Sequence, residues 1–451
     1  MNLRKIYISF ILVAGFLMML SCSSSKDDGI AKITLNVPAN ATLLQSLREK
    51  IPRFAQQKGI KIKLIPFSGQ EKLYAMLAAG MPPDIFYTNT VVRDRLAAEG
   101  RLVDIWQVAS GDTFVSQTRP VFIERGTSID GGWYQFCDWT YTFGVYFNKE
   151  LLDKYDVPYP DSAWTWQMMV ERARKLTHDF DHDGNIDQYG IFIARHFVSA
   201  IEQMNGAVYP PNALLFSFPG EAVEAQQAYL DLMFKERVMP ELGFSQAQGM
   251  QASQMLNSDR VAMIVEAVPN LDFIKSLTVD WDMAPIPRMG DHPPRYFRSA
   301  SGGLSISASC SNPEAAWDVI KWLVTESEYN SPNPILSDIN FVSSYENRYP
   351  ELKTKNFRQL WELSEKYDGG DQRDFVRYSS WSSSTILEQI NPKLDLIYAG
   401  KQPLSYLTTA MDEINKKVIE ELDSFLKNQN IGRVFKEKIK KELADHHFEG
   451  L

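Results

Sequence analysis

Apolar and polar positions in the first quarter of the chain follow two different periods. Residues 32–38 ("KITLNVP") and 60–67 ("IKIKLIPF") alternate as strands do, whereas residues 43–57 carry apolar side chains at helical spacing. A helix ending at Gly80, a strand in "PPDIFYTN" and a helix in "VVRDRLAAEG" continue the pattern. Three strand–helix units in succession predict an α/β first lobe, whose parallel sheet is covered by helices on both faces.

A doubly wound sheet of this kind binds its ligands in the crevice outside the carboxyl ends of its strands. Here two of these ends fall at residues 39–41 and 87–89. The candidate ligand-binding residues at these ends are Asn40, Tyr87, Thr88 and Asn89.

The middle of the chain has a different pattern. The extended aromatic stretch "WYQFCDWTYTFGVYFN" leads into one helix, and a second helix is predicted over residues 166–177 with Thr165 as its N-cap. The predicted buried face of this second helix carries Met168, Met169, Ala173 and Leu176. Strands over residues 260–266 and 281–287 predict a second α/β lobe, and the chain beyond residue 352 is mostly helical.

The first 22 residues have the pattern of a secretory signal. Arg4 and Lys5 precede an apolar run over residues 6–20, which is too short for a settled transmembrane helix. The following "LSC" resembles the lipobox of bacterial lipoproteins, and the Ser- and Asp-rich residues 23–31 suit a tether. We therefore expect Cys22 to be lipidated and to anchor the mature chain in the cell envelope, facing outside the cytoplasm. An ordinary signal peptide, cut nearby, is the alternative.

Composition narrows the function further. A net charge of −9 without a basic block argues against nucleic-acid binding, and 12% aromatic residues with ten tryptophans offer rings that could stack on a ligand. The sequence has no serine-hydrolase, zinc-protease or phosphate-loop motif, although the paired carboxylates of a glycosidase cannot be recognised from spacing.

Cys137 and Cys310 could pair after export or be two buried small side chains, and both interpretations stay open. Residues 434–444 alternate in charge, as a solvated helix face does.

Several phrases resemble one family, the extracellular solute-binding proteins of ABC transporters, in the branch that binds sugars. In order they are "LAAGMPPDIFYTN", "VYFNKELLDKYDVPYPDSAWTWQMMVERARKLT", "SDRVAMIVE" and "PIPRMGDHPPRYFRSASGGLSISASCSNPEAAWDVIKWLV", and they span roughly residues 70 to 325. The resemblance implies an α/β, two-lobe periplasmic-binding-protein fold of type II, with discontinuous lobes joined by hinge strands that close on a ligand. The expected division of the chain is a signal peptide over 1–22, a tether over 23–31, an N-terminal lobe over 32–140 plus 304–345, and a C-terminal lobe over 141–303 plus 346–451.

The aromatic stretch before the crossing between the lobes is where the resemblance implies ligand contacts, and its composition agrees. Sugars present apolar C–H faces to aromatic rings and hydroxyl groups to polar side chains. Asp138, Trp139 and Tyr141 are therefore candidate ligand-binding residues, with ordinary core packing of a strand as the alternative for each ring.

Five more ligand-binding candidates lie further along the chain. Glu266 ends a strand and could bind hydroxyls or a cationic group, or it could be a solvent-facing or ion-paired carboxylate. Arg298, with Ser301 and Gly302, precedes the return crossing, where glycines allow close backbone approach to a ligand or form a plain turn. Trp381 stands among small polar residues and could stack on a sugar or fill a groove between the lobes.

The stretch "DFDHDGNIDQYG" places carboxylates around a glycine with the spacing of half an EF-hand loop. Its candidate calcium ligands are Asp179, Asp181, Asp183, Asp187 and the backbone carbonyl of Asn185. Position 12 of the motif, normally a glutamate, is Gly190, so the cage is incomplete, and a turn held by its Asp side chains is an equal alternative. Some members of the resembled family carry such a loop away from the ligand, which implies a stabilising role here. No other cofactor is expected.

We therefore expect a monomeric, membrane-anchored binding protein that captures a carbohydrate, with an oligosaccharide favoured, and delivers it to the permease subunits of an ABC transporter. It should act by binding and not by catalysis. The alternatives are an anchored glycan-processing enzyme, which would turn over a glycan, and a binding protein for a polyamine or metal chelate. An acidic cleft would favour the polyamine.

Overall fold

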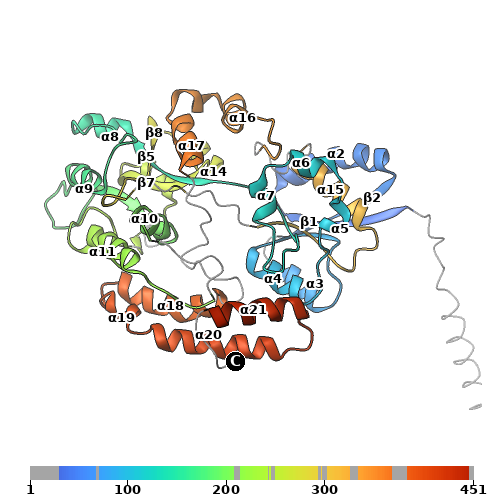
Figure 1. The fold of residues 1–451 in the computed structure, drawn as a ribbon. Helices are drawn as coiled ribbons and strands as arrows, with labels where there is room; N and C mark the ends of the chain where they lie inside the picture. The colour runs from blue at the N-terminus through green and yellow to red at the C-terminus, as the bar shows by residue number, and fades with distance from the viewer. Residues whose placement is uncertain are drawn as a thin grey trace, which may run out of the picture.

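The protein folds into two lobes, each built around its own β-sheet (Figure 1). The structure is a computed structural model that describes residues 30–67, 71–207, 214–241, 243–244, 249–292, 296, 302–325, 334–367 and 383–445. Cys22, the signal segment and most of the tether fall outside these residues, so their roles stay predictions. Within the described part of the chain, no helix combines the length and the apolar character that crossing a bilayer requires.

The first sheet has the strand order β2-β1-β3-β9-β4. Its first three strands are β1 (Ala31–Pro38), β2 (Ile60–Phe67) and β3 (Ile85–Thr88), and they run parallel as the sequence pattern predicted. The sheet then continues with β9 (Gly303–Ile306), antiparallel to β3, and β4 (Phe136–Cys137), antiparallel to β9. The sheet is therefore mixed, because β9 returns to it from the other lobe.

The helices of the first lobe pack on this sheet. They are α2 (Ala41–Lys58), α3 (Glu71–Ala78), α4 (Thr90–Ala98), the short α5 (Trp106–Ala109), α6 (Thr113–Gln117) and α7 (Pro120–Glu124), and α15 (Pro313–Thr325). Phe54 of α2 stacks on Trp322 of α15 at 4.6 Å, and the buried Trp133 and Trp317 meet edge to face. Both described cysteines, Cys137 and Cys310, are buried in this lobe and are not joined to each other by a disulfide bond.

The second sheet has the strand order β6-β7-β5-β8. Its strands are β5 (Thr142–Asn148), β6 (Tyr189–Ile193), β7 (Val261–Val268) and β8 (Trp281–Pro285). Its helices are α8 (Lys149–Lys154), α9 (Trp166–Lys175), α10 (Val198–Met204), α11 (Gly220–Phe234), α13 (Ala252–Asn257), α14 (Leu271–Ser276), α16 (Phe341–Arg348) and α17 (Phe357–Lys366), with the 3₁₀ turns η1 (Arg195–Phe197) and η2 (Pro350–Thr354). The cores on its two faces are separate, with α9 to α11 on one side and α13, α14, α16 and α17 on the other.

Helix α9 confirms most of its prediction. Thr165 accepts a hydrogen bond from the Met168 backbone N–H and caps the helix, while Met169, Ala173 and Leu176 are fully buried. The expectation that Met168 is also buried is wrong, since it is 36% exposed. Met168 lies about 100° around the helix from Met169, which takes it off the buried face.

The chain passes between the lobes over residues 138–141, between β8 and β9, and between α15 and α16. The expected boundary between residues 345 and 346 falls inside α16, and Phe341, Val342 and Tyr345 of this helix pack with the second sheet. The last crossing therefore ends before α16, because the whole apolar face of this helix packs in the core of the second lobe and a lobe boundary inside the helix would divide that face.

The C-terminal helices contact both lobes. They are α18 (Ser383–Tyr398), α19 (Ser405–Thr408), α20 (Met411–Lys427) and α21 (Arg433–Asp445), and they lie along one side of the molecule (Figure 1). Asn415 of α20 exchanges hydrogen bonds with the Phe216 backbone in the second lobe, and the Gly432 N–H donates to the Ala98 carbonyl in the first.

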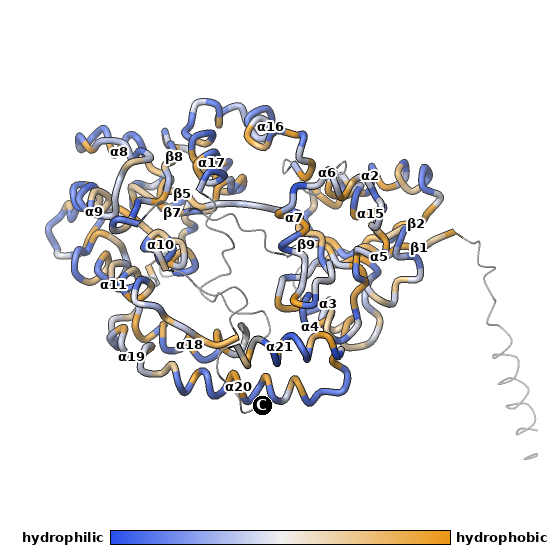
Figure 2. Tube along the Cα trace, viewed as in Figure 1, coloured by the Kyte–Doolittle hydropathy of each residue, from blue (hydrophilic) through white to orange (hydrophobic). Residues whose placement is uncertain are grey.

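Hydrophilic and hydrophobic residues alternate along α20 and α21 (Figure 2). Residues 434–444 were predicted to be a solvated face, but Phe435, Ile439 and Leu443 are buried. The charge alternation describes the outer side of α21 alone, and apolar residues three or four apart form a packed inner side.

Candidate functional site

Five of the predicted site residues meet where the chain first crosses between the lobes: Tyr87, Asp138, Trp139, Tyr141 and Gly302. Burial raises the pKa of the Tyr87 hydroxyl, and the nearby Asp138, Cys137 and Tyr141 raise it further. Gly302 has φ +85°, and a Cβ on it would lie 2.1 Å from the Tyr87 hydroxyl oxygen. The end of β3, the segment after β4 and the segment before β9 therefore come together at this point.

Asp138 is the buried polar group of this cluster. It is 6% exposed, and burial raises its carboxyl pKa to about 7, while a hydrogen bond from its own backbone N–H acts in the opposite direction. Low polarity disfavours the charged form of a carboxyl group. Near neutral pH this carboxyl group therefore populates both forms, and the protonated form can donate a hydrogen bond as well as accept one.

An aromatic row continues from the cluster into the second lobe; it consists of Trp139, Tyr141, Phe143 and Phe197. The Trp139 and Tyr141 rings are stacked at 4.3 Å with 27° between their planes. Phe143 meets Tyr141 at 5.4 Å and Phe197 at 4.9 Å, both edge to face. Trp139 is 37% exposed while Phe197 is buried, so the row presents its outer ring to solvent.

The candidates at the ends of β1 and β3 have a local role, with the exception of Tyr87. The Asn40 side chain accepts from the Leu43 N–H and caps α2, and the Asn89 side chain accepts from the Val92 N–H and caps α4. Thr88 is fully buried; its hydroxyl pairs with Ser305 at 2.8 Å and accepts from the Gln135 amide at 2.7 Å. The structure does not bring these three side chains into the cluster described above.

Glu266 lies on the other face of the second sheet from the aromatic row. Its neighbours two residues away, Ile264 and Val268, belong to the core beneath α16 and α17, and alternate residues of a strand share a face. Burial raises the pKa of the half-buried Glu266 carboxyl group, and its Oε1 accepts from the Ala267 N–H at 2.7 Å. A ligand role for Glu266 stays a prediction. Arg298, Ser301 and Trp381 fall outside the described residues, and their roles also stay predictions.

Three of the four aspartates in the acidic loop converge. Asp179, Asp181 and Asp187 each offer an oxygen within 4.8 Å of the other two. Each of these three also accepts from a backbone N–H of the loop: Asp179 from Gly184, Asp181 from Asp183 and Asp187 from Phe180. Asp183 lies outside the converging group and accepts from the backbone N–H and the side-chain amide of Asn185, at 2.7 and 2.9 Å. Carboxylate oxygens are ligands of hard cations such as calcium, which takes about six to eight oxygen ligands, so these three could supply part of a site. The predicted calcium site, with Asp183 and Asn185 included, stays a prediction.

The same loop is also tied to its surroundings without a cation. Arg260 donates to the Asp187 carbonyl and Arg237 to the Gly184 carbonyl, each at 3.0 Å. Gly190, at the position of the missing glutamate, lies so close to α9 that a Cβ would be 2.2 Å from the Ala173 carbonyl oxygen. The packing of the loop on α9 therefore explains why this position carries no side chain.

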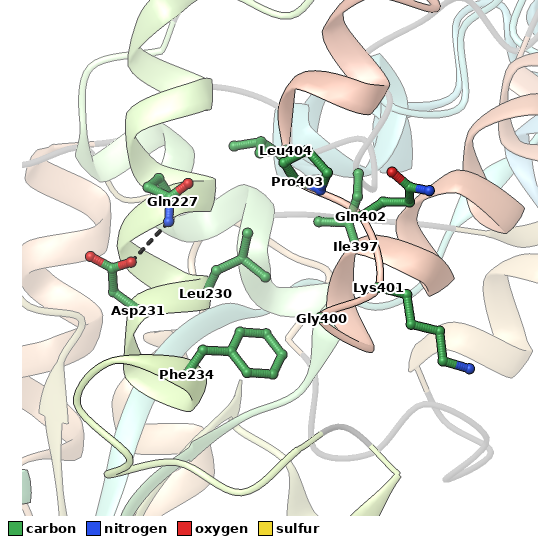
Figure 3. Close-up of a pocket in the computed structure, with 10 residues that line it drawn as sticks. All are labelled: Gln227, Leu230, Asp231, Phe234, Ile397, Gly400, Lys401, Gln402, Pro403 and Leu404. Carbon is green, nitrogen blue, oxygen red and sulfur yellow. Dashed lines mark hydrogen bonds between the residues drawn. The ribbon is translucent and has the colours of Figure 1, made fainter.

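The second lobe also has a groove of about 530 Å³ between α11 and the turn from α18 to α19 (Figure 3). Leu230, Ile397 and Leu404 form its buried floor, and Phe234 of α11 is 43% exposed at its side. None of the residues predicted for the ligand site lines this groove.

Phe143 and Phe197 are the members of the aromatic row that were absent from the sequence candidates, although Phe143 lies inside the aromatic stretch noted in the sequence. Phe197 is the one from a different part of the chain. It lies in η1, shortly after the carboxyl end of β6. The rule that placed candidates after β1 and β3 also points to this turn, so the signal was present in the sequence.

Known proteins share the sequence pattern of this chain. A family model described as bacterial extracellular solute-binding protein matches residues 40–329. The maltotriose-binding protein of Pyrococcus abyssi is 23% identical over 300 residues, which cover 64% of this chain and 61% of that protein. The match thus spans less than two thirds of the length of that relative.

Solved structures share the fold. An ABC substrate-binding protein from Listeria monocytogenes in complex with cycloalternan superposes with a TM-score of 0.70 at 19% identity, covering 86% of this chain and 99% of that one. A maltose/maltodextrin-binding domain from Bdellovibrio bacteriovorus bound to maltotriose gives 0.64 at 16% identity, covering 86% and 100%. These likenesses confirm the type II two-lobe fold that the sequence predicted.

Proposed function

Because the chain belongs to the family of bacterial extracellular solute-binding proteins, we propose that it binds a carbohydrate, with an oligosaccharide favoured, where the two lobes meet. The observation that carries the proposal is the stacked Trp139–Tyr141 pair beside the buried Asp138. A sugar ring would lie against the exposed Trp139 face, and its hydroxyls would bind Asp138 and Tyr87.

The chemistry of these groups suits a polyhydroxy ligand. Aromatic rings stack on the apolar C–H face of a sugar, and a few fixed polar groups orient it. A carboxyl group with a pKa of about 7 can pair with a hydroxyl in either protonation state. The relative named after maltotriose and the solved structures holding cycloalternan or maltotriose support a saccharide of more than one ring.

The proposed mechanism is capture and delivery without catalysis. The lobes would close on the ligand about the crossing segments, and the loaded protein would dock on the permease of an ABC importer. We propose that a lipid on Cys22 holds the protein at the membrane, with residues 23–31 as the tether. This part of the proposal rests on the lipobox-like sequence and on the family.

The test uses the chain without its first 22 residues and isothermal titration calorimetry with maltotriose, cycloalternan and a panel of other oligosaccharides. We expect at least one saccharide to bind with a one-to-one stoichiometry and to be recovered intact. Spermidine and a metal chelate serve as competing ligand classes. Tight binding of spermidine with none of the saccharides, or cleavage of a bound saccharide, would overturn the proposal.

A further inference from the structure

The inner end of the aromatic row is tied to the C-terminal helix α18 through one arginine. Arg195 begins η1, two residues before Phe197. Its Nη1 pairs with Asp395, and its Nη2 donates to the Asn391 side chain at 2.6 Å. These two acceptors lie one turn apart on α18, so the planar guanidinium bridges them as a fork.

Helix α18 is itself fixed on the body of the second lobe. The Tyr398 hydroxyl donates to Gln226 at 2.7 Å, and the Gln226 amide donates to Glu202 at 2.8 Å, all in the buried core. The Arg195 guanidinium lies 5.4 Å from the centre of the Tyr398 ring. Where α18 ends, Ile397 and the turn after it lie against α11 (Figure 3). Arg195 is therefore held by an element with its own buried anchor.

Contacts then lead from Arg195 to the exposed ring of the site. Phe197 is 3% exposed and packs edge to face on Phe143, which packs in the same way on Tyr141. Tyr141 carries the stacked Trp139. Protein interiors are close-packed, so a shift of a buried ring is passed to its neighbours.

We propose that Arg195 is a positioning residue for the ligand site: by holding η1 on α18 it sets the orientation of the aromatic row and thereby of Trp139. The link to affinity rests on the proposed function, whereas the link to ring orientation does not. The ion pair with Asp395 contributes little to stability by itself, because the Asp395 side chain is 66% exposed.

The test observes Trp139 directly. The chain is labelled with 5-fluorotryptophan, and the ¹⁹F resonance that disappears in Trp139→Phe is assigned to Trp139. Arg195→Met keeps the apolar part of the side chain and removes both hydrogen bonds to α18. Asp395→Asn removes the negative charge that pairs with the Arg195 guanidinium and leaves Arg195 itself unchanged. Asp423→Asn is the matched control, because Asp423 pairs with Lys427 within α20 and has no part in the row.

We expect Arg195→Met to shift or broaden the Trp139 resonance and to weaken maltotriose binding about 5- to 20-fold, a coupling of the usual size between linked sites. Asp395→Asn should act in the same direction and less strongly, and Asp423→Asn should change neither quantity. An unchanged Trp139 resonance in folded Arg195→Met overturns the proposal, even if affinity falls, because the arginine would then act on the ligand directly. If Arg195→Met does not fold, Asp395→Asn decides by the same resonance. The Trp139 resonance is measured without ligand, so it still tests the effect of Arg195 on ring orientation if no saccharide binds and the proposed function is wrong.

Discussion

Two regions of the molecule place polar side chains where an α/β fold binds ligands, and they use them differently. At the ends of β1 and β3, Asn40 and Asn89 turn back onto the helices that follow and cap them. At the crossing after β4, Asp138 and Trp139 precede another strand, with no helix to cap. A polar residue that begins a helix is used by the backbone N–H groups of the first turn, whereas the side chains at the crossing have no helix N-terminus to cap, which is consistent with the ligand role proposed for them.

The largest expected effect concerns Asp138 and stability. Its folded-state pKa of about 7 lies above the ordinary value of 3.8, so the folded state binds the proton more tightly than the unfolded state. Its contribution is fully present below pH 3.8 and is lost as pH rises to about 7. This loss is at most about 4 kcal/mol. Urea unfolding between pH 4 and 8 should show a flatter pH dependence in Asp138→Asn than in the wild type, and equal slopes would contradict the burial argument.

The next effect measures how much the close contact between Gly302 and Tyr87 at the crossing limits the residue at position 302. Gly302→Ala adds a Cβ 2.1 Å from the Tyr87 hydroxyl oxygen at a positive φ, whereas Gly131→Ala adds one at φ +89° with no atom within 4 Å. Positive φ alone costs about 1–3 kcal/mol. We expect Gly302→Ala to lose clearly more free energy of unfolding than Gly131→Ala, and Tyr87→Ala to remove the difference. Equal losses would show that Tyr87 moves aside freely.

Trp139 tests the proposed ligand contact. Trp139→Ala should weaken saccharide binding by about 1–3 kcal/mol, because a stacking face is lost, with little change in melting temperature. Trp106→Ala is the matched control, since Trp106 of the first lobe is 38% exposed and also contacts a second ring. If Trp139→Ala leaves saccharide affinity unchanged and lowers the melting temperature strongly, Trp139 packs in the fold and does not contact the ligand.

Asn89 tests the other region, the strand ends whose polar residues cap helices. Asn89→Ala should destabilise the protein by about 1 kcal/mol, as the loss of an N-cap does, while calorimetric saccharide affinity stays the same. Asn89→Asp keeps a capping oxygen and should retain wild-type stability. A fall in affinity in both variants would mean that this side chain reaches the ligand as well as the helix.

The smallest effect concerns the acidic loop, which lies in neither region. If Asp179, Asp181 and Asp187 bind calcium with a dissociation constant of about 10⁻⁴–10⁻³ M, 1 mM calcium should add roughly 0.4–1.4 kcal/mol of stability. Asp181→Asn should abolish the calcium-dependent rise in melting temperature, whereas Asp183→Asn should keep it. No rise in the wild type, compared with chelator, would leave the loop as a turn held by Arg237 and Arg260.

The sequence predicted the elements better than their partners. The first three strands of the first lobe and the Thr165 cap followed from local periodicity and capping, which are properties of neighbouring residues. The pairing of β4 and β9 did not, although the expected lobe boundaries put both strands in the first lobe, because the pairing of a short strand depends on the path of the whole chain. The same holds within the site: Tyr87, Asp138 and Tyr141 could be named from their surroundings, but the contact of Phe197 with Phe143 joins residues 54 positions apart. The capping roles of Asn40 and Asn89 required knowing where each helix begins, and a ligand role for these two side chains stays a prediction.

The place of β9 in the first sheet sets the order in which the two sheets can gain their strands as the chain is synthesised. β9 lies between β3 and β4, yet it follows every strand of the second sheet in the sequence. The second sheet can thus be assembled from one continuous stretch, before the first sheet has all its strands. Until β9 arrives, β3 presents an open edge with unpaired backbone groups, which is the kind of edge that associates with other chains. The first sheet is therefore the last of the two sheets to gain all its strands, while the second lobe still awaits α16 and α17, which follow β9 and complete its core.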